Sequence, residues 1–257
     1  MTEHNLLIQQ RMKKLFTEGF SVMDIAESLP VIDSCRPADD ALSLIEETRR
    51  PLLGMVEDGR ISSYLRVEDI SKGECGISAR PFDEMPVLDD TTSLPTAFEA
   101  LADSPYCFIR MNGEVRAIVG RVDIQKAPVR MWLFGMVTII EMFLSRIITE
   151  AYPDNGWRDM LSNNRLRRAE RFMRERARRG EGIRLIDCLQ LSDKANIVIK
   201  DPELFAMLRF ESKRSAQKAV KEFESLRNNL AHSHDLSLNW DTILQISRDI
   251  DIMVTRI

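Results

Sequence analysis

PVID at residues 30–33 recurs as PVLD at residues 86–89, and RVEDI at residues 66–70 recurs as RVDI at residues 121–124. The distance from PVID to RVEDI is similar to the distance from PVLD to RVDI, which is the pattern of an internal repeat. We therefore expect two copies of one structural unit before about residue 127. A chain of 257 residues with 44% hydrophobic residues has room for a second core beyond them.

Each copy contains the same order of secondary-structure signals. An amphipathic helix is followed by a short apolar strand, a tight turn and a second strand. The turns contain Asp58-Gly59 and Asn112-Gly113, and these dipeptides favour two-residue hairpins because glycine accepts a positive φ. The expected helices cover residues 38–47 and 93–101, and the expected first strands cover residues 52–56 and 107–111.

The repeated order resembles the CBS domain, over about residues 21–126, and two copies would form the pair in which that family usually folds. In CBS pairs that bind adenine nucleotides, the second strand runs into Gly-x-x-Thr/Ser-x-x-Asp. The aspartate of that motif binds the ribose hydroxyls, and the hydroxyl side chain contacts phosphate. Asp69 and Asp123 match the aspartate, whereas Arg66 and Gly120 stand at the hydroxyl position.

The resemblance implies a regulatory ligand such as AMP, ADP, ATP or a cyclic dinucleotide, bound by Asp69, Asp123 and Arg66. A guanidinium can replace a hydroxyl as a phosphate contact because it binds phosphate through two parallel hydrogen bonds. Two alternatives stay open. The aspartates can simply satisfy backbone N–H groups at the start of a helix, and some CBS pairs bind nothing and serve for dimerisation.

The second half of the chain has the spacing of helices. From Val129 on, apolar residues recur every three or four positions, which predicts an all-α bundle. The expected helices cover residues 129–151, 156–179, 183–198, 202–231 and 239–256. We therefore divide the chain into an N-terminal helical extension (1–20) that packs on the repeats, a repeat pair (21–127) and a helical domain (128–257).

In the helical half, a long amphipathic segment ends with the sequence RNNLAH at residues 227–232. This resembles the Arg-x-x-x-x-His signature of the HEPN superfamily, with Asn228 as the polar residue that often follows the arginine. An apolar first helix with an embedded carboxylate, Glu141, is also similar to that superfamily. The resemblance covers about residues 129–257 and implies metal-independent cleavage of RNA, with the motifs of two protomers meeting in a homodimer.

The residue types suit that chemistry. His232 can exchange protons near neutral pH as general acid or base, and Arg227 can stabilise charge on the phosphate oxygens. Asn228 would orient the phosphate or the histidine, and Glu141 would orient Arg227 if the two meet across the core, since a carboxylate in an apolar helix needs a partner. The alternative is a structural pair near a helix C-terminus, where cations are favoured.

Arginine dominates the segment between residues 165 and 179, where eight arginines occur. Phosphate contacts from such a helix would give RNA affinity without sequence specificity. The residues that we expect to bind RNA are Arg167, Arg168, Arg171, Arg174 and Arg178. The alternative is a solvated face whose arginines pair with Glu170, Glu175 and acidic groups of the repeats.

Composition supports two halves with different partners. Residues 1–127 carry 14 basic and 22 acidic residues, and the remainder carries 22 and 18, so the net charges are −8 and +4. The four cysteines have no spacing that predicts a metal site. The longest apolar run, residues 131–149, contains Glu141, which argues against a membrane span, and no secretory signal is visible, so we expect a cytoplasmic protein.

Together these features predict an endoribonuclease that needs no cofactor, leaves a 2',3'-cyclic phosphate and is regulated by nucleotide binding to the repeats. One alternative is a non-catalytic HEPN domain that binds RNA or protein and is dimerised by the repeat pair. Another is a regulatory partner of a second enzyme, as in toxin and stress-response systems.

Overall fold

The computed structural model of the chain describes residues 3–231 and 240–254. The chain forms two compact units. The repeat unit extends from Phe20 to Val129, and the helical unit combines residues 1–19 with residues 130–257. Each unit is described by itself below.

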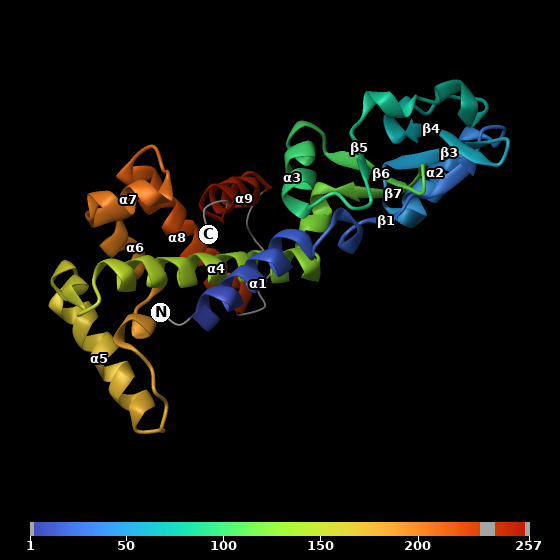
Figure 1. Cartoon of the computed structure of the whole chain (residues 1–257). Coiled ribbons are helices and arrows are strands. Elements are labelled where there is room, and N and C mark those ends of the chain that lie inside the picture. The colour runs from blue at the N-terminus through green and yellow to red at the C-terminus, as the bar shows by residue number, and fades with distance from the viewer. Residues whose placement is uncertain (1–2, 232–239, 255–257) are drawn as a thin grey trace. The chain divides into compact units, whose positions relative to one another are not determined.

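The repeat unit contains two small sheets (Figure 1). In the first sheet, β2 is parallel to β3 and β3 is antiparallel to β4; in the second, β5, β6 and β7 repeat this arrangement. One helix lies between the first and second strand of each copy. The elements are β2 (Val31–Asp33), α2 (Ala38–Thr48), β3 (Leu52–Glu57), β4 (Arg60–Arg66), β5 (Val87–Asp89), α3 (Leu94–Asp103), β6 (Tyr106–Met111) and β7 (Glu114–Gly120).

The two hairpins have the same register. Leu52 lies opposite Arg66 as Tyr106 lies opposite Gly120, and each ladder shifts after its fourth pair. The predicted turns are confirmed: Asp58 and Gly59 have φ of 50° and 75°, and Asn112 and Gly113 have 50° and 84°. Positive φ at both central residues is the type I′ geometry, whose twist matches that of paired strands.

Both copies contribute to a shared core. Tyr64 of β4 and Phe108 of β6 are fully buried, with ring centroids 5.0 Å apart, and Phe82 packs edge-on against Phe108 at 4.8 Å. The short strand β1 (Glu27–Ser28) precedes the first copy but pairs with β7 of the second. The two repeats therefore form one body rather than two separate domains.

Short 3-10 turns complete the repeat unit. They cover Val22–Asp24, Val67–Asp69, Cys75–Ser78, Phe82–Glu84 and Arg121–Gln125. The segments that carry Asp69 and Asp123 are such turns. These two aspartates therefore do not begin regular α-helices.

The helical unit is built around α4 (Ala127–Ala151). Its most deeply buried side chains include Trp132, Leu133, Val137, Ile140, Leu144 and Ile148. The other helices are α1 (Glu3–Glu18), α5 (Asn163–Ala177), α6 (Leu191–Lys200), α7 (Pro202–Leu208), α8 (Lys213–Ala231) and α9 (Trp240–Val254), with 3-10 turns at Gly156–Met160 and Leu185–Cys188. The predicted all-helical half is confirmed.

Three of the predicted helices are divided in the structure. The segment 202–231 breaks at Arg209, which has a φ of 57°, and α8 begins after Ser212. Ser162 caps α5 by accepting a hydrogen bond from the Arg165 N–H, so the segment 156–179 separates into a 3-10 turn and a helix. The segment 183–198 likewise separates at Leu189. Periodicity alone did not reveal these breaks because the apolar spacing continues across them.

The N-terminal helix corrects one expectation. Helix α1 was expected to pack on the repeats, but it belongs to the helical unit. A Cβ atom added to Gly135 of α4 would lie 2.0 Å from the Phe16 ring, so the absence of a side chain at residue 135 permits close contact between these helices.

Within the described residues, α4 is the one helix long and apolar enough to span a membrane. However, 67% of its most apolar stretch is buried by the rest of the protein. Burial of this kind is typical of the central helix of a folded core.

Candidate functional site

Arg227 lies on α8, where its guanidinium donates a hydrogen bond to Glu141 Oε2 over 3.0 Å. Glu141 lies in the middle of α4, 86 residues away in sequence. From the sequence, this contact was the condition for Glu141 to orient Arg227, and the structure shows the contact. It satisfies the carboxylate inside an otherwise apolar helix and limits the orientations of the guanidinium.

Lys194 is the residue of this cluster that sequence reasoning missed. Its ammonium group donates to Glu141 Oε1 over 2.8 Å, and its side chain is only 4% exposed. A lysine this deeply buried needs a counter-charge. The one negative charge of Glu141 is thus shared between two cations, so the cluster carries a net positive charge. The signal in the sequence was a lysine directly before the segment ANIVI (residues 195–199) of α6.

A cavity of about 680 Å³ adjoins this cluster. Arg227 forms part of its wall, α5 forms another part, and the segment leading into α6 forms a third. The residues that line it include Arg165, Arg168, Arg171, Phe172, Glu175, Asp187 and Asp193. The structure therefore brings the proposed catalytic arginine and part of the arginine-rich helix to the same cavity.

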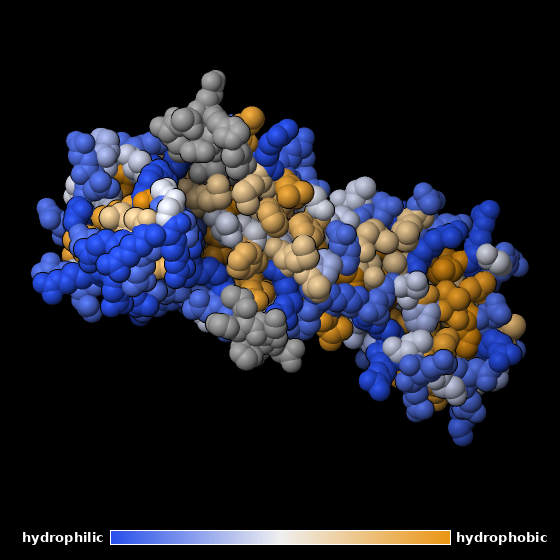
Figure 2. Space-filling view, turned by 90° about the horizontal axis from the view of Figure 1, so that it is seen from below, coloured by the Kyte–Doolittle hydropathy of each residue, from blue (hydrophilic) through white to orange (hydrophobic). Residues whose placement is uncertain are grey.

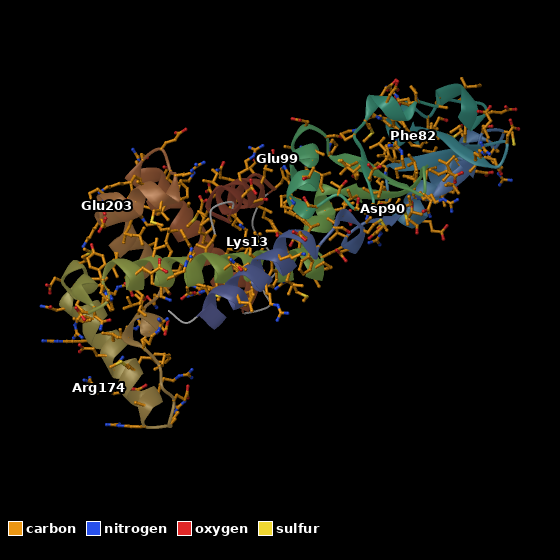
Figure 3. All side chains as sticks on the ribbon, in the orientation of Figure 1. Lys13, Phe82, Asp90, Glu99, Arg174 and Glu203 are labelled. Carbon is orange, nitrogen blue, oxygen red and sulfur yellow. The ribbon has the colours of Figure 1, made fainter. Side chains whose placement is uncertain are left out.

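The arginines of α5 serve two different surfaces. Arg168 and Arg171 line the cavity together with Arg165, whereas Arg167, Arg174 and Arg178 are exposed and do not line it. Figure 3 shows Arg174 on the yellow helix α5. Figure 2 shows a broad hydrophilic surface at the end of the helical unit that contains this helix.

Few acidic partners neutralise these side chains. Arg165 pairs with Asp193 at 3.4 Å and Arg176 with Glu181 at 2.7 Å. Glu170, which we considered as a partner within α5, instead pairs with Arg158. In the part of the chain that the structure describes, no ion pair is found for Arg167, Arg168, Arg171, Arg174 or Arg178. The alternative of a self-neutralised arginine face is therefore disfavoured.

The other two predicted catalytic residues are Asn228 and His232. Asn228 is exposed on the last turn of α8, one position beyond Arg227. His232 lies outside the described residues. The structure thus brings together Arg227 and Glu141 of the predicted set and adds Lys194.

Asp123 is not available for the ribose hydroxyls of a nucleotide, which is the role that the sequence motif suggested. It is 2% exposed and receives both terminal nitrogens of Arg50, at 3.1 and 2.9 Å. It also accepts from the Gly120 N–H at 2.7 Å and lies 3.0 Å from the ammonium group of Lys126. With this many partners, Asp123 has no open side for ribose hydroxyls. Glu27 completes the cluster, and its hydrogen bonds from Lys126 and Arg50 lower its pKa.

The position of Gly120 has no room for a phosphate-binding side chain. A Cβ atom at this position would lie 2.7 Å from the Tyr106 ring, its partner across the ladder. The corresponding pair in the first copy is Leu52 and Arg66. The Tyr106 ring therefore excludes a side chain at residue 120, whereas Leu52 stands opposite a full arginine side chain at the matching position.

Asp69 pairs with Arg80 of the segment between the copies. Arg80 donates two hydrogen bonds to its carboxylate, at 2.6 and 2.7 Å, and this lowers the pKa of Asp69. The side chain of Asp69 remains 20% exposed and that of Arg80 37%. Asp69 is therefore paired with Arg80, but its side chain is more exposed to solvent than that of Asp123.

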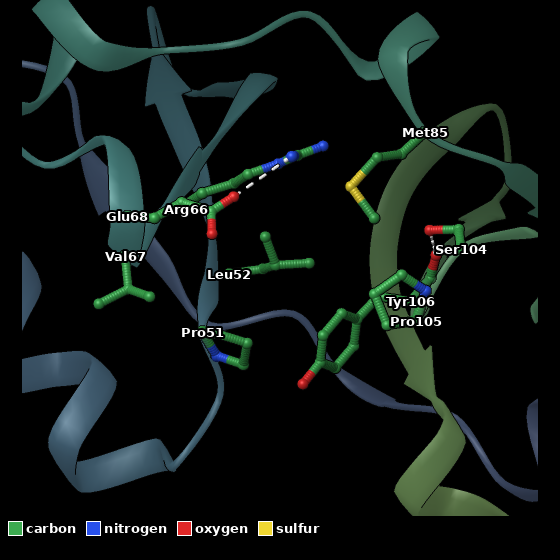
Figure 4. Close-up of a pocket in the computed structure, with 9 residues that line it drawn as sticks. All are labelled: Pro51, Leu52, Arg66, Val67, Glu68, Met85, Ser104, Pro105 and Tyr106. Atoms are coloured by element: carbon green, nitrogen blue, oxygen red, sulfur yellow. Dashed lines mark hydrogen bonds and ion pairs between the residues drawn. The ribbon is translucent and has the colours of Figure 1, made fainter. Parts of the chain in front are cut away.

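Arg66 lines a pocket of about 140 Å³ between the two copies (Figure 4). Its guanidinium donates to the Tyr64 hydroxyl at 3.0 Å and pairs with Glu68 at 3.4 Å. Leu52, Met85 and Tyr106 provide most of the apolar wall. Arg66 thus lines an opening between the copies, whereas Asp69 and Asp123 are not among the residues that line it.

In the part of the chain that the structure describes, no group of three or more histidine, cysteine, aspartate or glutamate side chains is placed to hold a metal ion. Burial raises the pKa of the Cys107 thiol to about 12, so this cysteine stays protonated.

Comparison with known proteins gives neighbours for part of the chain. No protein-family model matches the sequence, and no curated protein matches it. Solved structures of CBS-pair proteins are similar to it. CBSX2 in complex with AMP covers 44% of this chain and 98% of its own, with 19% identity and a TM-score of 0.39.

CBSX2 from Arabidopsis thaliana has a TM-score of 0.38 at 19% identity and covers 44% of this chain and 96% of its own. A CBS domain-containing protein from Bacillus anthracis has a TM-score of 0.37 at 15% identity and covers 44% of this chain and 94% of its own. These structural neighbours are thus CBS-pair proteins. Identities and scores of this size are too low to transfer a ligand or an activity to this chain.

Proposed function

We propose that the helical unit is a metal-independent endoribonuclease whose substrate enters the cavity between α5 and α8. The observation that carries the proposal is the position of Arg227, which is held by Glu141 on the wall of a cationic cavity. Preorganised donors of this kind stabilise charge that develops in a transition state without having to reorient.

The reaction would follow the residue types. His232 or its counterpart in a second protomer removes the proton of the 2'-hydroxyl, whose oxygen forms a bond to the adjacent phosphorus. The bond from phosphorus to the 5'-oxygen breaks, and that oxygen receives a proton from a general acid. Arg227 stabilises the negative charge on the phosphate oxygens. The products are a 2',3'-cyclic phosphate and a 5'-hydroxyl.

Incubation of the full-length protein with total RNA in EDTA, followed by analysis of the fragment ends, tests this activity. Arg227→Ala and His232→Ala should each lower cleavage by at least about 100-fold, the usual effect of losing a transition-state donor or general base. Arg214→Ala, an exposed position on the same helix, is the matched control and should cleave normally. Intact RNA with the unmodified protein, or cleavage that persists in both active-site variants, would refute the nuclease proposal.

The repeat unit is proposed to regulate this activity by binding an adenine nucleotide at the Arg66 pocket. Leu52, Met85 and Tyr106 offer an apolar surface for a base, and Arg66 offers a phosphate contact. At about 140 Å³ the pocket is below the roughly 300 Å³ typical of small-molecule sites. It would therefore enclose the base and leave the phosphates at its mouth.

Calorimetry with AMP, ADP, ATP and cyclic dinucleotides tests this part. We expect one ligand per chain, because Asp123 and Gly120 close the equivalent position in the second copy. Arg66→Ala should weaken binding about tenfold or more through the lost charged hydrogen bond. Binding of two ligands per chain, or unchanged binding in Arg66→Ala, would contradict the assignment. A rate of RNA cleavage unaffected by every bound nucleotide would reject regulation.

A second candidate function is RNA binding without cleavage, with the repeat pair as a dimerisation unit. The unpaired arginines of α5 favour it, because phosphate contacts alone require neither Arg227 nor His232. Retained RNA binding by a chain that never produces cyclic phosphate ends would support this alternative.

A further inference from the structure

Phe172 is an exposed aromatic ring on an otherwise polar helix. It is 45% exposed, whereas Ala169 on the same helix is buried. Phe172 lines the cavity that Arg227 also reaches. An apolar ring this open to solvent adds little to the core, and at the wall of an arginine-lined cavity it is accessible to a ligand.

The ring has cationic neighbours on its own helix. The Arg176 guanidinium lies over it at 5.6 Å from the centroid and is held there by Glu181. Arg168, one turn before Phe172, and Arg171, its direct neighbour in sequence, line the same cavity. The site therefore combines an aromatic surface with several guanidinium groups.

Most of the acidic residues that line the cavity are paired with arginines. Asp193 pairs with Arg165, and Asp187 is held by two hydrogen bonds from Arg184, at 2.8 and 2.9 Å. Glu175 is the remaining acidic residue of the lining. Arg168 and Arg171, for which no ion pair is found among the described residues, outnumber it, so the cavity favours a polyanion.

We propose that Phe172 is a stacking platform for an unpaired base, with Arg168 and Arg171 binding the flanking phosphates, so that the ligand is single-stranded rather than double-stranded RNA. An aromatic ring in a cationic groove is the combination that binds single strands, because every unpaired base exposes a stacking face. In a duplex these faces are covered by neighbouring bases. This inference rests on the proposed function only in taking RNA as the ligand.

Fluorescence anisotropy with 2'-O-methyl RNA tests the platform independently of cleavage, since such RNA has no 2'-hydroxyl to attack phosphate. A single-stranded oligonucleotide is compared with a duplex of the same length. Phe172→Ala should weaken binding of the single strand by at least about fivefold, the lower end expected for one stacked base, and Phe172→Trp should restore it. The weaker duplex binding should not change.

Phe134→Ala is the matched control, because Phe134 is also a phenylalanine with 45% exposure, but it lies on α4 and does not line the cavity. It should bind as the unmodified protein does. The quenching of a 2-aminopurine base in the single strand reports stacking directly and should be lost in Phe172→Ala.

The outcomes separate the two proposals. If the unmodified protein binds no oligonucleotide, both RNA recognition and the platform are refuted. If it binds but Phe172→Ala binds single strands equally well, or loses single-stranded and duplex binding to the same extent, only the platform is refuted and the proposed nuclease stands.

Discussion

The two repeats share their backbone but not the use of their matching aspartates. Their hairpins have the same register, the same type I′ turn and a shift at the same step of the ladder. Asp69 is partly exposed and pairs with Arg80 of the segment between the copies. Asp123 is buried and pairs with Arg50 of the other copy.

This difference shows which features of a repeat are constrained by folding. Strand pairing and turn geometry depend on backbone conformation, so they are retained in both copies. The aspartate three residues beyond the second strand is free to take another role. In the second copy, Asp123 forms a buried ion-pair cluster that joins the copies, whereas in the first copy Arg66 lines the pocket between them.

Replacing Asp123 with alanine should have the largest effect on stability. It leaves the guanidinium of Arg50, which is 8% exposed, with Glu27 alone, and removing one partner of a buried ion pair costs about 3–5 kcal/mol. Hydrogen exchange measured by mass spectrometry on β3, β4, β6 and β7 can follow the repeat unit. Tryptophan fluorescence cannot, because Trp132, Trp157 and Trp240 all belong to the helical unit.

The double variant Arg50→Met with Asp123→Leu is the control for this prediction. Apolar replacement of both partners of a buried pair is often neutral or stabilising. The double variant should therefore recover much of the protection from hydrogen exchange that Asp123→Ala loses. Equal protection in Asp123→Ala and the unmodified protein would show that the cluster does not hold the copies together.

The hairpin turns should give equal and smaller effects in the two copies. Gly59→Ala and Gly113→Ala each place a side chain at a positive φ, at a cost of about 1 kcal/mol. Open space surrounds both positions, so no steric clash is added. Urea unfolding followed by circular dichroism measures the loss for each variant, and a large difference between the two would contradict the equivalence of the turns.

The sequence predicted features that depend on local chemistry or on a fixed period. The hairpin turns followed from Asp-Gly and Asn-Gly, and the copies followed from their matching ends. The carboxylate in an apolar helix indicated that Glu141 needs a partner, and Arg227 was considered as that partner. Partners chosen by tertiary packing were not predictable. Arg50 meets Asp123 across 73 residues, and Lys194 reaches Glu141 from a helix whose register with α4 no local pattern specifies.

The pairing of Asp69 with Arg80 should give the smallest effect and the clearest dependence on pH. Asp69→Asn removes a partly exposed ion pair, worth about 0.5–1 kcal/mol at neutral pH. Because the hydrogen bonds from Arg80 lower the pKa of Asp69 in the folded state, the stabilisation is fully present above the unfolded pKa of about 3.9 and is lost as the pH falls through the lower folded value. The difference in stability between the unmodified protein and Asp69→Asn, measured by urea unfolding at a series of pH values, should therefore shrink below about pH 4. A difference that grows on acidification would mean that the carboxylate is destabilised in the folded repeat, and the distinction drawn between the two aspartates would fail.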